Sequence, residues 1–301
     1  MNAETVTTTA SRETDPVGEP TQEPRPSIRV GTWNLKYRDA VVAAAQGRHA
    51  ANFELDLLAL QEANPSALPA FVEAAGFDWA ISASDLRVRP PREGAGRKAT
   101  SALVGRCEPP RTTRLFTHVH LPERLVAIEI NSPIGPLTAV SYHGPPGASW
   151  GKIKVHHALA LARWLETTKG TVIVGADANT PKIDHPDPTR TRTHWHTGSR
   201  KLETGEPGDD NMFGTSPCHD LRDALRTWLE RYPDASERIR SGRPDGPLAI
   251  TYRTSGSNPM RYDHLWHSRD LTVEEIQHDY HGAVDAGSDH ALVWAEFSLD
   301  R

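Results

Sequence analysis

The stretch Thr171-Val-Ile-Val-Gly-Ala-Asp-Ala-Asn179 constrains the fold of this chain more than any other. Its β-branched apolar residues predict a strand buried on both faces, and Gly175 permits a turn or the close approach of another segment. Asp177 and Asn179 would point the same way from the end of this strand if the extended geometry continues. Since Gly-x-Asp-x-Asn also describes ordinary Asx turns, the rest of the sequence must decide between a site and a turn.

Two earlier apolar runs end in the same manner. The run 27–35 alternates as a strand and ends at Asn34, and the run 55–62 finishes in Gln61 and Glu62. Periodicity and turn signals predict further strands over 77–82, 100–106, 124–131, 136–142, 248–253, 261–268, 271–278 and 291–299. They predict helices over 40–52, 65–75 (with Asn64 as the N-cap), 150–168 and 220–231.

The order of these elements bounds the fold class. Strands and helices alternate irregularly, which favours an α/β (α+β) sandwich of mixed sheets flanked by helices over a doubly wound parallel sheet. The runs 100–106, 124–131 and 136–142 follow one another between Pro/Gly turns, which is consistent with an antiparallel meander.

One domain over residues 27–301 accounts for this pattern, because no internal repeat appears. Residues 1–26 lack an apolar run, so we expect a disordered tail and not a secretory signal. The polar segment 181–217 is too long for an ordinary connection and is predicted to be a functional loop. Nowhere are there 18 uninterrupted apolar residues, so no membrane span is expected.

Charge and cysteine content exclude some functions. The formal net charge of −5 argues against binding nucleic acid by bulk charge, so any phosphate chemistry must be local or assisted by a metal ion. The two cysteines, Cys107 and Cys218, have no metal-ligand spacing and suit a reducing cytoplasm, where we expect a monomeric protein.

Basic residues gather in two predicted loops. Arg97 and Lys98 end a loop rich in Arg, Pro and Gly, and the segment 190–196 would align four basic side chains on one face if it were extended. Such a face could hold a phosphate backbone, but a solvated loop without function explains it equally well. A zinc site formed by His194 and His196 is disfavoured, because no third ligand is evident. The four side chains are those of Arg190, Arg192, His194 and His196.

Polar groups recur at the ends of strands and at tight turns, and no serine or cysteine nucleophile is among them. Hard oxygen ligands suit Mg²⁺ or Mn²⁺, while imidazoles suit proton transfer and contact with an oxyanion. This combination fits hydrolysis of a phosphoester by a metal-polarised water. The set consists of Asn34, Glu62, His143, Asp177, Asn179, Asp263, Asp289 and His290.

These residues lie in short motifs whose order resembles that of the endonuclease/exonuclease/phosphatase superfamily, the deoxyribonuclease-I-like fold. The resemblance covers residues 28 to 297 and implies a four-layer sandwich, in which two mixed, mainly antiparallel sheets pack face to face between helices. Each motif is weak alone, but six in order are a strong signal. The motifs are Thr-Trp-Asn34-Leu, Leu-Gln-Glu62, Tyr-His143, Gly-Ala-Asp177-Ala-Asn179, Tyr-Asp263 and Ser-Asp289-His290.

The resemblance implies a role for each matching position. Glu62 would be the principal ligand of Mg²⁺ or Mn²⁺, supported by Asn34 and Asp289. Asp177 and Asn179 would orient the attacking water and the scissile phosphate. His290, oriented by Asp263, would contact the phosphate, and either Asp177 or His290 would be the base. His143 would be the general acid.

One departure from the family pattern weakens the role of His143. In deoxyribonuclease I a carboxylate on a neighbouring strand orients the matching histidine. The corresponding run here, 98–103, offers only Thr100 and Ser101.

The leading hypothesis is therefore a divalent-metal-dependent phosphodiesterase, and within that class a nuclease that hydrolyses DNA or RNA. The alternative is the same chemistry on a small phosphoester, such as an inositol phosphate, a phospholipid head group or a nucleotide, because the fold does not select among substrates. A scaffold protein that has lost activity is disfavoured by the intact set of polar residues.

Overall fold

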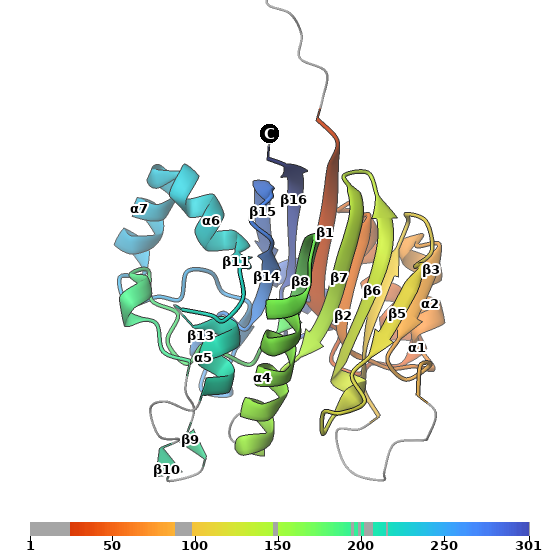
Figure 1. Ribbon diagram of the computed structural model, residues 1–301, viewed down its shortest axis with the longest axis horizontal. Helices are drawn as coiled ribbons and strands as arrows, with labels where there is room; N and C mark the ends of the chain where they lie inside the picture. The colour runs from red at the N-terminus through yellow and green to blue at the C-terminus, as the bar shows by residue number, and fades with distance from the viewer. Residues whose placement is uncertain are drawn as a thin grey trace, which may run out of the picture.

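The computed structural model describes residues 25–87, 98–146, 150–193, 196–197, 200–201, 207–214 and 216–300. Two six-stranded sheets form its centre (Figure 1). In the first sheet the strand order is β15-β16-β1-β2-β4-β3. These strands are β1 (Ser27–Asn34), β2 (Leu57–Ala63), β3 (Trp79–Ser82), β4 (Thr100–Gly105), β15 (Leu271–Asp279) and β16 (Leu292–Leu299).

The second sheet has the order β11-β14-β8-β7-β6-β5. Its strands are β5 (Thr112–Leu115), β6 (Leu125–Ser132), β7 (Gly135–His143), β8 (Thr171–Asp177), β11 (Arg222–Asp223) and β14 (Asp263–His267). Two short ribbons, β9 (His196–Thr197) with β10 (Arg200–Lys201) and β12 (Tyr252–Arg253) with β13 (Pro259–Met260), lie outside these sheets.

Each six-stranded sheet is antiparallel except for one central parallel pair. β1 runs parallel to β2, and β7 runs parallel to β8. Neighbouring parallel strands deliver their carboxyl ends to the same edge of a sheet. In Figure 1 these four strands all end at the lower edge, so each central pair sends two strand ends there.

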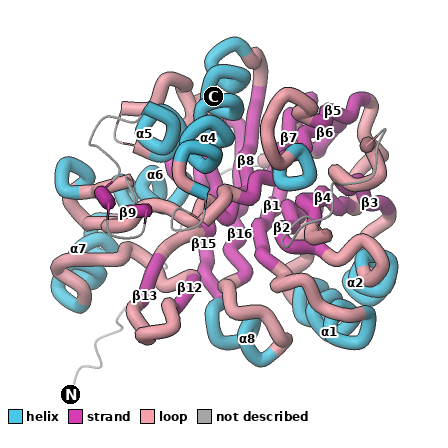
Figure 2. The backbone as a smooth tube through the Cα atoms, turned by 90° about the horizontal axis from the view of Figure 1, so that it is seen from below, coloured by secondary structure: helices cyan, strands magenta, loops and turns pink. Residues whose placement is uncertain are grey.

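Helices cover the outer face of each sheet and complete four layers. Figure 2 shows the sheets between α1, α2 and α8 on one side and α4 and α5 on the other. The helices are α1 (Ala40–Ala51), α2 (Leu68–Ala75), α4 (Lys152–Thr167), α5 (Pro207–Phe213), α6 (Ala224–Arg231), α7 (Pro233–Gly242) and α8 (Tyr280–Asp285), and two 3₁₀ turns are η1 (Pro122–Arg124) and η2 (Pro188–Arg190).

Three hydrophobic clusters correspond to the three interfaces between these layers. Along β8, Val172 and Val174 pack outward beneath α4, whereas Ile173 packs inward between the sheets, so this strand is buried on both faces as its sequence predicts. The sheets approach very closely at Gly175, where an added Cβ would lie 2.6 Å from the Cβ of Ala59. Glycine at this position is therefore required by the packing of the two sheets.

The predicted fold class is confirmed, but three local predictions are wrong. The runs 100–106, 124–131 and 136–142 do not form one meander, because β4 pairs with β2 and β3 while β6 and β7 belong to the other sheet. The second helix begins at Leu68 and not at Pro65, and Asn64 binds the amide of Ser66 in a preceding turn. The run 248–253 is extended as β12 only at its end.

The described part of the segment 181–217 contains η2 and α5, and helices α7 and α8 are further elements that the sequence patterns did not predict. No described helix is long and apolar enough to cross a membrane.

Candidate active site

The carboxyl ends of the two central strand pairs meet across the sandwich. Asn34 ends β1 and donates from Nδ2 to Oδ2 of Asp177 at the end of β8, over 2.8 Å. The Oδ1 atom of Asn34 accepts from the amide of Lys36 at 2.8 Å, which fixes the orientation of its side chain. Both side chains are buried. A polar bridge between the sheets thus forms the floor of the candidate site.

Several residues at this edge have a left-handed backbone, among them Lys36 and Tyr37 shortly after β1. Glu62 and Asn179 both have φ of 49°, in the left-handed region that residues other than glycine rarely adopt. Glu62 lies where the pairing of β2 with β4 shifts register between Leu60 and Ala63, so a bulge redirects its side chain. Each such residue costs on the order of 1–3 kcal/mol, and residues of this kind gather at functional sites.

The turn after β8 is held by several polar contacts. The amide of Asn179 donates to Oδ1 of Asp177 at 3.1 Å, and its Nδ2 donates to the carbonyl of Gly144 at 2.9 Å. Buried Lys154 on α4 donates from Nζ to the carbonyls of Ala178 at 2.8 Å and Asn179 at 3.1 Å. These contacts fix the conformation in which Asp177 faces the other strand ends.

Asp263 and His290 form a buried pair beside Asp177. Nδ1 of His290 lies 2.9 Å from Oδ2 of Asp263, and β14 pairs Asp263 directly with Asp177. Burial alone would lower the pKa of His290, but the carboxylates of Asp263 and Asp177 raise it to about 10. The imidazole is therefore protonated at neutral pH and offers positive charge to an anion.

His143 has the opposite electrostatics. Its Nε2 lies 3.0 Å from an Nη1 of buried Arg124, and 3.6 Å from carboxylate oxygens of both Glu62 and Asp177. Burial, followed by the charge of Arg124, holds the pKa of His143 well below its usual range. Because a guanidinium can only donate, Nε2 of the neutral imidazole accepts this bond. A neutral His143 is poorly suited to the predicted role of general acid.

The predicted metal ligands present carboxylate oxygen at this edge. The side chain of Glu62 is 33% exposed, whereas that of Asp177 is only 1% exposed, so Glu62 is the more accessible of the two. Burial raises the pKa of Glu62, and the charges of Asp177 and Asp289 raise it further. Carboxylates that repel one another and offer hard oxygen donors suit a divalent cation such as Mg²⁺ or Mn²⁺. Asp289 here forms an ion pair with Lys36 at 2.9 Å.

A second group of possible ligands overlaps this site. Among the described residues, Asp177, Asp263 and His290 bring one donor atom each within 4.8 Å of one another. Asp263 and His290 already bind each other, and a cation there would have to break that hydrogen bond. Asp289 and the Oδ1 atom of Asn34 are likewise engaged, by the ammonium group and the amide of Lys36, so the metal site predicted at Glu62, Asn34 and Asp289 stays a prediction.

The predicted substrate-binding residues lie in different surroundings. Arg190 ends the 3₁₀ turn η2, whereas Arg192 is extended and bridges to Ile183, so the described part of the predicted face 190–196 is extended at Arg192 but not at Arg190. Arg190 contacts Asp245 at 3.3 Å, Arg192 donates to carbonyls of its own loop, and Lys98 is exposed. The backbone of His196 lies in β9. Arg97 and His194 lie outside the described residues.

Two buried cations at this edge, Arg124 and Lys154, are not among the site residues predicted from the sequence. Arg124 ends η1 immediately before β6 and reaches His143, and no sequence pattern singles it out. Lys154 could have been found from its spacing, because it lies on the same face of an amphipathic helix as the apolar residues Ala158, Leu161 and Leu165. A lysine on a buried face needs polar partners, which points to a site beneath the helix.

Strand-end carboxylates, an acid-imidazole pair and buried cations define a class of hydrolase that acts on phosphoesters. The chain belongs to the Endonuclease/Exonuclease/phosphatase family, whose model matches residues 31–290. This is a family of phosphoester-hydrolysing enzymes that generally use divalent metal ions. A comparison with curated protein sequences found no significant match.

Solved structures share the fold at low sequence identity. Among them, D. rerio TDP2 complexed with single-strand DNA product is 13% identical, with a TM-score of 0.62 over 91% of this chain and 99% of that one. An endonuclease/exonuclease/phosphatase from Bacteroides vulgatus is 12% identical, with a TM-score of 0.60 over 91% and 99%. The endonuclease domain of TRAS1, a telomere-specific non-LTR retrotransposon, is 15% identical, with a TM-score of 0.54 over 92% and 100%.

Proposed function

We propose that this protein is a divalent-metal-dependent phosphodiesterase, and within that class a nuclease that cleaves DNA or RNA. The proposal rests on the proximity of Asp177 to Asn34, to Glu62 and to the Asp263–His290 pair at one edge of the sandwich. This edge combines accessible carboxylate oxygen with a protonated imidazole. Phosphodiester hydrolysis needs both, since charge develops on the phosphoryl and leaving oxygens.

His290 and Asp177 have separate roles in this proposal. His290 carries positive charge at neutral pH and hydrogen bonds a non-bridging oxygen of the phosphate, while Asp263 holds its ring in place. A protonated imidazole cannot accept a proton, so Asp177 is the base. Burial, and then the neighbouring Asp263, raise the pKa of Asp177, which makes its carboxylate a stronger proton acceptor.

Arg124 takes the place of a general acid. Its guanidinium is buried next to His143, and its Nε has no hydrogen-bond partner among the described residues. A buried, permanently charged donor stabilises an anionic oxygen without transferring a proton. Arg124 therefore faces the leaving oxygen, and neutral His143 orients it. Asn179 positions the phosphate from the fixed turn after β8.

The metal site of the proposal consists of Glu62, with Asn34 and Asp289 in support. A divalent cation bound there would polarise the phosphate and lower the pKa of a water molecule. The side chain of Lys36 is 40% exposed, so it can move aside and release Asp289 to this site.

Nucleic acid is the proposed substrate class. Two of the proteins with a similar fold are TDP2 complexed with single-strand DNA product and the endonuclease domain of TRAS1. The alternative is a small phosphoester, such as an inositol phosphate, a phospholipid head group or a nucleotide, and the net charge of −5 favours it.

We also propose a single domain over residues 27–301 and a monomeric state. The free thiols of Cys107 and Cys218 favour the reducing cytoplasm as the compartment.

Hydrolysis of a substrate panel tests this proposal. The purified protein with Mg²⁺ or Mn²⁺ should cleave single-stranded or double-stranded nucleic acid, and EDTA should abolish cleavage. Preferential turnover of inositol phosphates, phospholipids or nucleotides would favour the alternative. No turnover on any member of the panel would contradict phosphodiesterase activity.

A further inference from the structure

A groove lies on the outer side of the second sheet, between α4 and the loop that follows β5. Its volume is about 670 Å³. His118 and His120 come from the loop, and His156, Arg163 and Trp164 come from α4. All but Trp164 of these five are exposed. Neither the candidate active site nor the matched motifs include them.

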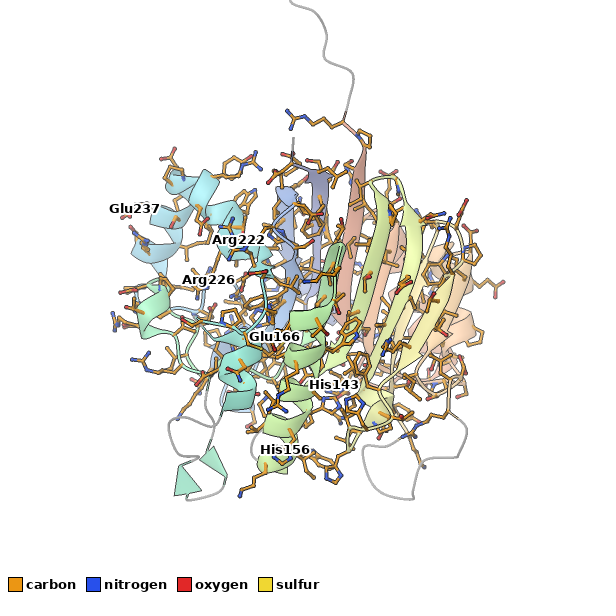
Figure 3. All side chains as sticks on the ribbon, viewed as in Figure 1. His143, His156, Glu166, Arg222, Arg226 and Glu237 are labelled. Atoms are coloured by element: carbon orange, nitrogen blue, oxygen red, sulfur yellow. The ribbon has the colours of Figure 1, made fainter. Side chains whose placement is uncertain are left out.

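The groove adjoins the proposed active site through two short connections. His157 forms part of the wall, binds the carbonyl of Leu121 through Nε2 at 3.0 Å, and packs against Tyr142 with ring centroids 5.4 Å apart. Tyr142 precedes His143, and Leu121 leads through η1 to Arg124. Figure 3 shows the labelled His143 and His156 toward the lower end of the molecule, where the central strands end.

The chemistry of the groove complements an anion. The chain has 39 acidic and 34 basic residues, yet none of the described residues that line this groove carries a carboxylate. Arg163 and the imidazoles are not the only basic groups here. The guanidinium of Arg114 adds a further positive charge, 5.8 Å from the ring centre of Trp164. Exposed Lys152 does not line the groove itself, but it shares one helix face with His156 and Arg163, because steps of four and seven residues return to the same side. The groove thus combines cations, imidazoles and an indole.

We propose that this groove binds the backbone of a single nucleic-acid strand that extends from the scissile phosphate. The inference rests on the proposed phosphodiesterase function and deepens it, because a polymeric substrate can extend from the strand ends along α4. From Lys152 to Arg163 the helix rises roughly 16 Å at 1.5 Å per residue. That length matches roughly four to five nucleotides of stacked strand at 3.4 Å each.

Binding without turnover tests the groove directly. The probe is a fluorescein-labelled dT12 oligonucleotide, and its dissociation constant is measured by anisotropy in EDTA at several salt concentrations. Lys152→Gln with Arg163→Gln should weaken binding about tenfold at low salt. It should also reduce the slope of log affinity against log salt by about 1.4, because two phosphate contacts are lost. Circular dichroism melting checks that the variant is folded.

A matched control removes two positive charges elsewhere. Arg238→Gln with Arg240→Gln changes exposed residues of α7, at the left of Figure 1 and away from α4, and should change the dissociation constant by less than about twofold. Equal effects of the two double variants, or no binding of the oligonucleotide by the unchanged protein, would overturn the inference.

Turnover of bis(4-nitrophenyl) phosphate separates this inference from the proposed function, since so small a diester cannot span the groove. The ratio of kcat/KM for the oligonucleotide to that for the small diester should fall about tenfold in the α4 variant and stay constant in the α7 variant. Hydrolysis of the small diester with equal oligonucleotide binding by both variants would leave the proposed function standing and overturn the groove. Oligonucleotide binding at the groove without hydrolysis of either substrate would contradict the proposed function alone.

Discussion

Single residues at the strand ends differ in charge state because their nearest neighbours differ. His290 lies against Asp263 and Asp177, whereas His143 lies against Arg124. The same side chain is therefore held protonated in one place and neutral in the other, although both are buried. Sequence motifs identify both histidines but do not distinguish these states.

The stability contributed by the charge on His290 should depend on pH in a defined direction. Its pKa is raised from 6.5 to about 10 on folding. The contribution is therefore fully present below pH 6.5 and is lost progressively as the pH rises through 10. In EDTA, the difference in free energy of unfolding between the unchanged protein and His290→Asn should shrink from pH 6 to pH 10, by denaturant titration. A difference that is constant over this range would contradict a protonated His290.

Arg124 should matter more for turnover than for folding. Removing one preorganised donor from a developing anion typically costs about 10²–10³ in kcat. Arg124→Gln is expected to lower kcat about a hundredfold and, because a cation beside the imidazole is lost, to raise the pKa of His143 in an NMR titration. Arg111→Gln, an exposed residue near the far end of β6, is the matched control. Equal rates for the two variants would exclude the proposed role of Arg124.

At the scale of elements, the sequence identifies strands well and their partners poorly. The apolar runs that end at Asn34, Glu62 and Asp177 form β1, β2 and β8, because burial of β-branched residues is a local property of the chain. Pairing depends on contacts between distant segments, which explains why β4 joins β2 instead of β6. The left-handed conformation of Glu62 and the contact between Arg124 and His143 are likewise set by the assembled sheets, so no local pattern predicts them.

The packing of the two sheets predicts the effect of enlarging Gly175. A methyl group there would lie 2.6 Å from the Cβ of Ala59 and 3.0 Å from the Cβ of Thr32, so the sheets would have to separate. Overpacking of this kind costs about 1–3 kcal/mol. Gly175→Ala should lower the free energy of unfolding by that amount in denaturant titration. Gly242→Ala, where a Cβ would contact nothing within 4 Å, should have little effect. A Gly175→Ala variant as stable as the control would refute the close sheet contact.

At the scale of the whole molecule, the fold explains where the candidate site lies. Two sheets with central parallel pairs face each other, so four strands end at one edge. These strand ends place Asn34, His143 and Asp177 there, together with Glu62 in the bulge of β2. β14 and the segment before β16 add Asp263 and the adjacent residues Asp289 and His290. The order of motifs along the sequence resembles the family because this topology requires it.

The activity of Glu62→Gln is the most direct test of a divalent-metal site at these strand ends. The substitution keeps the size of the side chain but removes the accessible carboxylate at the proposed metal site. With saturating Mg²⁺ or Mn²⁺, kcat on a phosphodiester should fall at least about a hundredfold, as is typical when a principal charge-stabilising group is lost, while the melting temperature changes little. Glu73→Gln, an exposed residue of α2, should retain full activity. Equal activity of the two variants at every metal concentration would contradict a divalent-metal site at these strand ends.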